Sequence, residues 1–175
     1  MGELFDKLAN YGNSGIYPFH MPGHKRQKTV DFNPYKIDIT EIEGFDNLHH
    51  AEGVLLEAQK KAEKLYGSEE SHFLINGSTA GILSAVSACA KKTVLIARNC
   101  HKAVYHAALI RNLDVYYVYP EIQEEFMLNG GINPADVERS LEEHPEIEAV
   151  VITSPTYDGI VSDVKRIAEI AHAHK

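Results

Sequence analysis

Small and hydroxyl-bearing residues follow an apolar run near the middle of the chain, in the segment Asn76–Gly81. The run itself, Ser71–Ile75, is predicted to be a strand, and a helix is predicted over Ser78–Lys91. The free main-chain N–H groups of the first helical turn would converge with the hydroxyls of Ser78 and Thr79. Such a point suits a phosphate group.

Gly77 would let the chain turn tightly and approach a ligand closely. The segment lacks the lysine of a nucleotide P-loop and the spacing of a dinucleotide fingerprint. We therefore expect a small phosphorylated cofactor rather than ATP or NAD. An ordinary helix start capped by a serine explains the same residues and stays open as an alternative.

Two more polar segments follow buried-type strands. His101 opens a helix shortly after the predicted strand Thr93–Ala97, and the turn Ser154–Gly159 follows the predicted strand Ala149–Thr153. Ligands of open α/β sheets bind at the carboxyl ends of the strands, so both segments are candidates for one crevice. The alternatives are a helix-cap or surface histidine and a plain polar turn.

A metal site is not expected. His20 and His24 are four residues apart, but Pro22 and Gly23 between them prevent the helix that would place both imidazoles on one face. The other histidine pairs and the acidic residues near the N-terminus lack a convincing ligand spacing.

Helices and strands alternate along the second half of the chain, which favours an α/β fold with a mostly parallel sheet flanked by helices. The predicted helices are Glu3–Asn10, Glu52–Tyr66 (ended by Gly67), Ser78–Lys91, His101–Asn112, Pro134–Glu143 and Ser162 to the end; the predicted strands are Ser71–Ile75, Thr93–Ala97, Val115–Tyr119 and Ala149–Thr153.

The predicted domain organisation is an N-terminal helix and arm over residues 1–50, followed by a partial cofactor domain over 51–175. The chain stops on a helix where the alternation would place another strand. We therefore expect an incomplete sheet with an open edge, and such edges favour association.

Composition excludes several classes of function. The chain has 175 residues, 44% of them hydrophobic, which suffices for one sizeable core. A net charge of −8 without a Lys/Arg-rich run argues against nucleic-acid binding. Two isolated cysteines, no signal peptide and no membrane-spanning stretch lead us to expect a cytoplasmic protein with no membrane partner.

Five segments together resemble the Orn/Lys/Arg decarboxylase family, from about Tyr17 to the C-terminus and in the family's order. They are His20–Lys25, Asp38–His49, Phe73–Gly81, Arg98–Lys102 and Thr153–Gly159. The resemblance implies the front part of the large domain of pyridoxal 5'-phosphate (PLP) fold type I. It also implies loss of the α-carboxylate from lysine, ornithine or arginine, giving a polyamine-type amine.

The resemblance also assigns roles to single residues. Gly77, Ser78 and Thr79 would bind the cofactor phosphate, and His101 would stack on the pyridine ring as the catalytic residue of this segment. Ser154 and Thr156 would line the other edge of the ring. The family builds its sites at dimer interfaces, so a homo-oligomer is expected, with the arm near the active-site mouth or the partner subunit.

The family pattern continues beyond these motifs with an Asp that pairs with the pyridine nitrogen and a Lys that attaches the cofactor covalently. Neither is found in the sequence, because Lys102 and Lys175 both read as helix lysines. We therefore expect the chain alone to be inactive, as the N-terminal part of a decarboxylase or as a truncated product. A non-catalytic remnant that binds phosphate or PLP weakly, or associates with a full-length homologue, is the alternative. An aminotransferase or aldolase of the same scaffold also stays possible.

Overall fold

The structure is a computed structural model that describes residues 3–19, 24–27 and 31–174. It forms two compact units, Met1–Ser71 and His72–Lys175. Part of the His20–Lys25 motif and Lys175 lie outside the described residues. The sequence predicted a boundary after residue 50, between the arm and the cofactor domain. This domain boundary stays a prediction.

The described residues of the first unit form two α-helices and two short 3-10 turns. Helix α1 spans Glu3–Gly12 and helix α2 spans Val54–Tyr66, while the turns η1 and η2 span Pro34–Lys36 and Leu48–His50. Gly67 ends α2 in the left-handed conformation, with a φ of 66°, as the sequence predicted.

The Asp46 carboxylate caps the start of α2. Its two oxygens accept the main-chain N–H groups of Asn47, Glu52, Gly53 and Leu55 at 2.8–3.0 Å. These hydrogen bonds, led by that from Glu52, hold the pKa of Asp46 well below its ordinary value. Gly53 contributes no side-chain cap, so Asp46 supplies the acceptor that the first turn of α2 needs.

Asp46→Ala is expected to loosen this turn, because the N–H groups of Gly53 and Leu55 lose their acceptor. Their amide hydrogens should exchange about tenfold faster. Since the folded-state pKa is lowered, the contribution of Asp46 is present above its unfolded-state pKa and is lost only in strongly acidic solution. Equal exchange rates in the wild type and the variant at neutral pH would contradict this assignment.

The second unit is built on a three-stranded parallel sheet in the order β2-β1-β5. Strand β1 spans Thr93–Ala97, β2 spans Asp114–Val118 and β5 spans Ala149–Val151. The apolar run of β1 is buried at every position because it lies between the other two strands. Strand β1 pairs parallel with both neighbours, which confirms the mostly parallel sheet predicted from the sequence.

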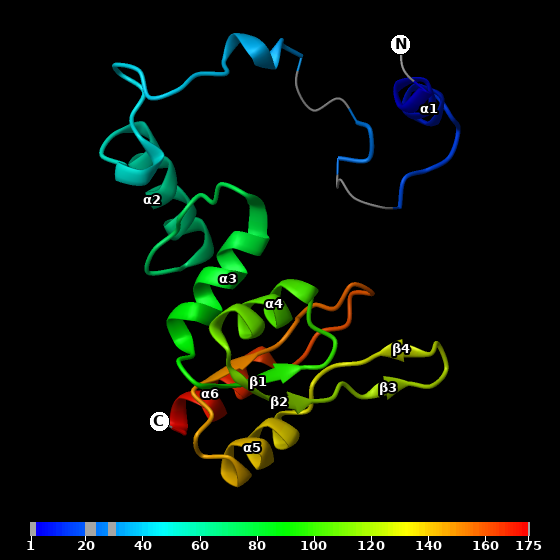
Figure 1. Cartoon of the computed structure of the whole chain (residues 1–175), viewed down its shortest axis with the longest axis vertical. Coiled ribbons are helices and arrows are strands. Elements are labelled where there is room, and N and C mark those ends of the chain that lie inside the picture. The colour runs from blue at the N-terminus through cyan, green and yellow to red at the C-terminus, as the bar shows by residue number, and fades with distance from the viewer. Residues whose placement is uncertain (1–2, 20–23, 28–30, 175) are drawn as a thin grey trace. The chain divides into compact units, whose positions relative to one another are not determined.

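Helices cover both faces of this sheet (Figure 1). Helices α3 (Gly77–Cys89) and α4 (Lys102–Arg111) pack together on one face, and α5 (Pro134–Glu143) and α6 (Val164–Ala173) pack together on the other. The core between these layers is aliphatic, and Leu95 and Ile96 of β1 and Val137 and Leu141 of α5 are among its largest fully buried side chains. The α/β prediction is confirmed.

Two parts of the second unit differ from the prediction. The strand predicted over Ser71–Ile75 is wrong, because this segment is irregular and Phe73, Leu74 and Ile75 are exposed. An apolar run becomes a strand only where a neighbouring strand pairs with it, and β1 has β2 and β5 on its two sides. The loop predicted before Gly130 contains a small antiparallel hairpin, β3 (Ile122–Gln123) with β4 (Leu128–Asn129).

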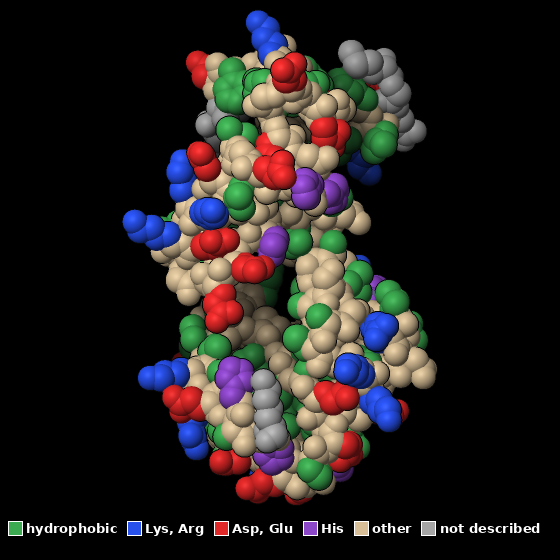
Figure 2. Space-filling model, turned by 90° about the vertical axis from the view of Figure 1, so that its left-hand side faces the viewer, with side chains coloured by type: hydrophobic (Ala, Val, Ile, Leu, Met, Phe, Trp, Pro, Cys, Tyr) green, Lys and Arg blue, Asp and Glu red, His purple; other side chains and the backbone are tan. Residues whose placement is uncertain are grey.

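Side chains of both charges lie on the face seen in Figure 2. On the face seen in Figure 2, Lys and Arg side chains are interspersed with Asp and Glu, and no large basic patch gathers there. None of the helices in the described part of the chain is long and apolar enough to cross a membrane.

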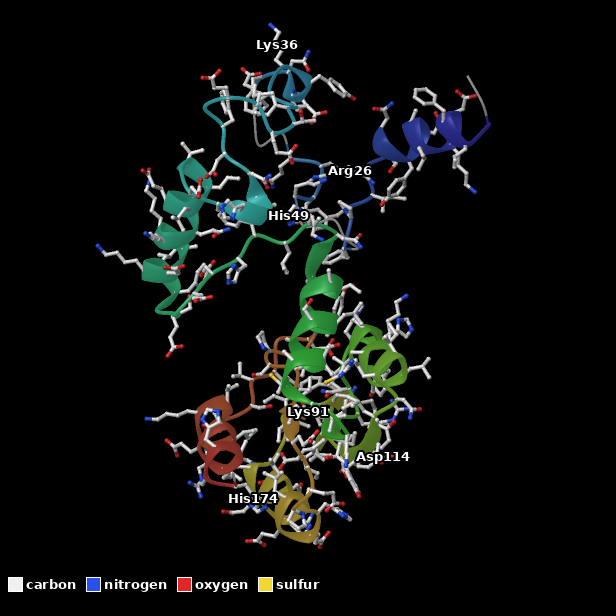
Figure 3. The ribbon with its side chains drawn as sticks, turned by 60° about the vertical axis from the view of Figure 1, so that its left-hand side comes forward. Arg26, Lys36, His49, Lys91, Asp114 and His174 are labelled. Carbon is white, nitrogen blue, oxygen red and sulfur yellow. The ribbon has the colours of Figure 1, made fainter. Side chains whose placement is uncertain are left out.

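The Glu148 carboxylate stabilises the edge of the sheet at which the strands begin. The labelled Lys91 and Asp114 mark this edge in Figure 3. One oxygen of Glu148 accepts the main-chain N–H groups of Lys91 and Lys92 at 2.6 and 2.7 Å and that of Thr93 at 3.3 Å. These bonds lower the pKa of Glu148 and tie the start of β1 to the residue just before β5.

Candidate active site

The order of the strands places a crevice at the carboxyl ends of β1 and β5. From β1 the chain crosses through α4 to β2 on one side, whereas β5 lies on the other side of β1. The connections that leave β1 and β5 therefore diverge, and ligands of open α/β sheets bind where they diverge.

A hollow of about 590 Å³ extends along β5, and at the carboxyl end of that strand it contains polar groups from both connections. His101 lies after β1, and Thr153 and Ser154 lie after β5. The remaining lining is apolar and comes mainly from α3 and β5. The structure thus brings together His101 and Ser154, as the sequence reasoning expected, while their roles as cofactor ligands stay predictions.

His101 is the N-cap of α4. Its Nδ1 accepts the main-chain N–H of Ala103 at 3.2 Å, which satisfies one of the free donors of the first turn. In the neutral ring the proton then lies on Nε2, because Nδ1 is used as the acceptor. The helix-cap alternative is therefore confirmed, and the same ring lines the hollow.

Cys100 links the two connections, a role that the sequence reasoning missed. Its thiol lies 3.5 Å from the carbonyl oxygen of Val151, and the hydroxyl of Thr153 donates to its sulfur at 3.4 Å. Burial raises the pKa of the Cys100 thiol, so the thiol stays protonated and can donate to Val151. The sequence signal that could have indicated this role is a cysteine beside a histidine directly after a buried strand.

In the turn after β5, the hydroxyl groups of Thr156 and Ser154 lie in different places and make different hydrogen bonds. Thr156 is buried, and its Oγ1 accepts the main-chain N–H of Ile160 at 3.1 Å, so this side chain closes the turn and does not line the hollow. Ser154 lines the hollow while its Oγ accepts the N–H of Ser162 at 3.1 Å. The Ser154 hydroxyl hydrogen is still available as a donor.

The start of α3 carries the predicted phosphate-binding residues. Asn76 and Gly77 have φ values of 65° and 72°, and Asn76 makes no side-chain cap hydrogen bond. Gly77, Ser78 and Thr79 are exposed, and the space around the Gly77 Cα is open. The serine-cap alternative is wrong, because the N-cap is Asn76 and its side chain does not cap the helix.

The start of α3 differs from the starts of α4, α5 and α6, where a side-chain acceptor lies at the first turn. The residues Gly77, Ser78 and Thr79 do not line the hollow. Ile82 does line it, and Ile82 lies three residues after Thr79, which is about 4.5 Å along the helix axis. Free main-chain N–H groups at a helix start are donors of the kind that bind a phosphate.

Arg98 is another residue whose position the sequence did not reveal. It follows β1 directly, and its guanidinium donates to the Tyr105 hydroxyl at 3.0 Å and lies over the rings of Tyr105 and Tyr117, 5.4 and 5.7 Å from their centroids. The hydrogen bond to Tyr105 raises the pKa of Arg98. Partners 7 and 19 residues away leave no local pattern in the sequence.

Within residues 3–19, 24–27 and 31–174, no three His, Cys, Asp or Glu side chains cluster as metal ligands would. His24 belongs to this part of the chain, whereas His20 lies outside it.

Known proteins resemble this chain along almost its whole length. The uncharacterized protein YaaO of Bacillus subtilis is 36% identical over 97% of the chain, which spans 37% of that protein. The arginine decarboxylase of Bacillus cereus is 31% identical over 98% of the chain and 39% of its own length. The inducible lysine decarboxylase of Escherichia coli is 29% identical over 98% of the chain and 28% of its own length. The chain thus spans less than two fifths of these relatives.

Solved structures show the same fold. The constitutive lysine decarboxylase of Escherichia coli superposes with a TM-score of 0.67 and 25% identity over 98% of this chain and 27% of that one. A PLP-bound C-S lyase from Staphylococcus hominis, at 14% identity and a TM-score of 0.53 over 81% of this chain and 36% of that one, shares the fold alone. Residues 3–175 match the family described as "Orn/Lys/Arg decarboxylase, major domain". The chain therefore belongs to the Orn/Lys/Arg decarboxylase family and has the α/β fold of PLP fold type I enzymes.

Proposed function

We propose that this chain is the N-terminal part of a PLP-dependent decarboxylase of lysine, ornithine or arginine, and that it supplies the phosphate-binding end of the cofactor site. The observation that carries this proposal is the start of α3, where Asn76 leaves the first turn without a side-chain cap beside Ser78 and Thr79. The family match over residues 3–175 gives the chemistry that such a site would serve.

Each residue of the site would perform a limited task. The main-chain N–H groups at Gly77 and the hydroxyls of Ser78 and Thr79 would hold the phosphate. His101, held by its bond to the Ala103 N–H, would present one ring face to the cofactor, and Ser154 would donate its hydroxyl hydrogen to the edge. When bound, PLP supplies the electron sink for loss of a carboxylate.

Thr156 would act through the turn rather than by contact. Because its side chain closes the turn through Ile160, it would fix the position of Ser154 at the rim of the hollow. This modifies the role that the family resemblance implied for Thr156, which was a place beside the ring.

The proposal includes a limit on activity. The chain holds no residue that we assign to the pyridine nitrogen or to covalent attachment of the cofactor, so residues 1–175 alone are expected to bind PLP reversibly and not to release carbon dioxide. The substrate would be a basic amino acid, as the names of the relatives indicate for those proteins. We also propose that it acts in the cytoplasm and as a homo-oligomer.

The experiment adds PLP to the purified chain, records the visible spectrum, reduces with borohydride and maps any modified lysine. Release of carbon dioxide from arginine, lysine and ornithine is measured in parallel, with the Bacillus cereus arginine decarboxylase as the positive control. Reversible binding with no modified lysine and no release is the expected result. Modification of Lys102, turnover, or failure to bind PLP would each contradict the proposal.

A further inference from the structure

A short turn joins the end of β1 to the start of α4 and leads into His101. The N–H of Cys100 donates to the carbonyl of Ala97 at 3.0 Å, so the chain turns sharply as it leaves the strand. His101 is exposed, and its ring is held through Nδ1 by the Ala103 N–H at 3.2 Å. One such bond keeps the ring in place only where the main chain before His101 is itself fixed. The contacts that fix this turn therefore decide where the His101 ring lies.

The hydroxyl of Tyr105 connects α4 to the end of β1. Tyr105 lies four residues after His101, which is about one turn of the helix. Its hydroxyl donates to the main-chain carbonyl of Arg98 at 2.7 Å, and the Arg98 guanidinium donates to the hydroxyl oxygen at 3.0 Å. The hydroxyl thus uses its one hydrogen and a lone pair on the same residue. Because His101 lies between Arg98 and Tyr105 in the chain, these two bonds enclose it.

The ring of Tyr105 is packed, so its hydroxyl has a defined position. The ring stacks on that of Tyr117 in β2, with centroids 6.4 Å apart and an angle of 30° between the planes. The Arg98 guanidinium lies over both rings, and the Arg98 N–H donates to the carbonyl of Val118 at 2.8 Å. All these partners belong to the continuous segment from β1 to β2, so the contacts are complete within that segment.

The other end of the turn is fixed by Cys100. Its thiol donates to the carbonyl of Val151 and accepts from the hydroxyl of Thr153, which places its partners in β5 and just after it. The turn is thus attached to α4 through Arg98 and to β5 through Cys100. Since both ends are fixed, these two attachments set the direction of the next residue, His101.

We propose that Tyr105 is a positioning residue, whose hydroxyl holds the turn before α4 so that the His101 ring borders the hollow. Tyr105 does not line the hollow, so it acts through His101 rather than by contact with a ligand. Its effect on cofactor binding rests on the proposed function, in which one face of the His101 ring meets PLP. The hydroxyl bonds of Tyr105 do not reach the start of α3, so phosphate binding there should not change.

Tyr105→Phe tests the role, because it removes the hydroxyl and keeps the ring, its stacking on Tyr117 and its contact with Arg98. Tyr117→Phe is the matched control, because Tyr117 contacts the same two side chains through its ring. Within residues 3–19, 24–27 and 31–174 the Tyr117 hydroxyl makes no hydrogen bond. The two variants therefore differ in the hydroxyl bonds to Arg98.

The first measurement is made without PLP and concerns the His101 ring alone. In mildly alkaline solution, where histidine rings are neutral, the ring ¹⁵N signals of the wild type and of Tyr117→Phe should be those of the Nε2–H tautomer. In Tyr105→Phe the two ring nitrogen signals should move toward each other, as in a ring that exchanges between tautomers. The Ala103 amide should exchange about three- to tenfold faster, while that of Ala107, further along α4, should not change.

The second measurement compares the affinities for PLP and for inorganic phosphate. Tyr105→Phe should weaken PLP binding about three- to tenfold and leave phosphate binding unchanged, and Tyr117→Phe should change neither. Ring signals of His101 that are the same in Tyr105→Phe and the wild type overturn the proposal. Equally faster exchange at Ala103 and Ala107 also overturns it, because it shows that the whole helix is loosened. A wild type that binds no PLP contradicts the proposed function instead, and the ring signals then decide the role of Tyr105.

Discussion

Leu95→Ala is expected to lower the free energy of unfolding of the second unit by about 2–5 kcal/mol. Leu95 is fully buried in β1, the central strand, and its neighbours in the sheet are Tyr116 of β2 and Val150 of β5. The substitution removes apolar contacts and leaves a cavity between two helical layers that cannot collapse fully. Urea unfolding followed by far-ultraviolet circular dichroism measures the change.

Leu109→Ala is the matched control for this experiment. Leu109 is 78% exposed on α4, so the same chemical change should alter stability by less than about 0.5 kcal/mol. Similar losses for Leu95→Ala and Leu109→Ala would show that β1 is not the centre of the core.

The double variant Ser78→Ala/Thr79→Ala is expected to weaken PLP binding by about 10- to 100-fold. Both hydroxyls lie at the uncapped start of α3, and hydrogen bonds to a charged phosphate are stronger than those to neutral groups. Ser84→Ala serves as the control, because Ser84 is exposed on the same helix two turns from its start. The dissociation constant for PLP, from fluorescence titration, gives the comparison.

Titrations with inorganic phosphate distinguish residues that bind the phosphate group from residues that bind the pyridine ring. Ser78→Ala/Thr79→Ala should weaken binding of both phosphate and PLP, whereas His101→Ala should weaken PLP binding and leave phosphate affinity unchanged. A loss of phosphate affinity in His101→Ala would mean that His101 acts on the helix start rather than on the ring. An unchanged PLP affinity in the double variant would place the phosphate elsewhere.

Local sequence determines the parts of the fold that were predicted correctly. The strand Thr93–Ala97 and the helix Pro134–Glu143 were predicted with their observed bounds. The first is a run of apolar and β-branched residues, and the second follows an Asn cap and begins with proline. Gly67 likewise ends α2 where expected, because glycine adopts the left-handed conformation without strain.

Other features depend on partners far along the chain. Nothing within Ser71–Ile75 reveals that no strand pairs with it, and the link from Cys100 to Thr153 spans 53 residues. The sequence indicated that His101 and Ser154 lie at one edge of the sheet. It could not show that the Thr156 side chain accepts a hydrogen bond within its own turn, because that bond depends on how the chain folds back at Ile160.

The central claim is that the start of α3 holds the phosphate of PLP, and a titration of the ¹⁵N-labelled chain with PLP, followed by amide NMR, tests it most directly. The amide signals of Gly77, Ser78 and Thr79 should shift in a saturable way, and excess inorganic phosphate should reverse the shift. The amide of Ala135, whose helix start is already capped by Asn133, should stay unchanged. No saturable shift at Gly77 to Thr79, or an equal shift at Ala135, would contradict the claim.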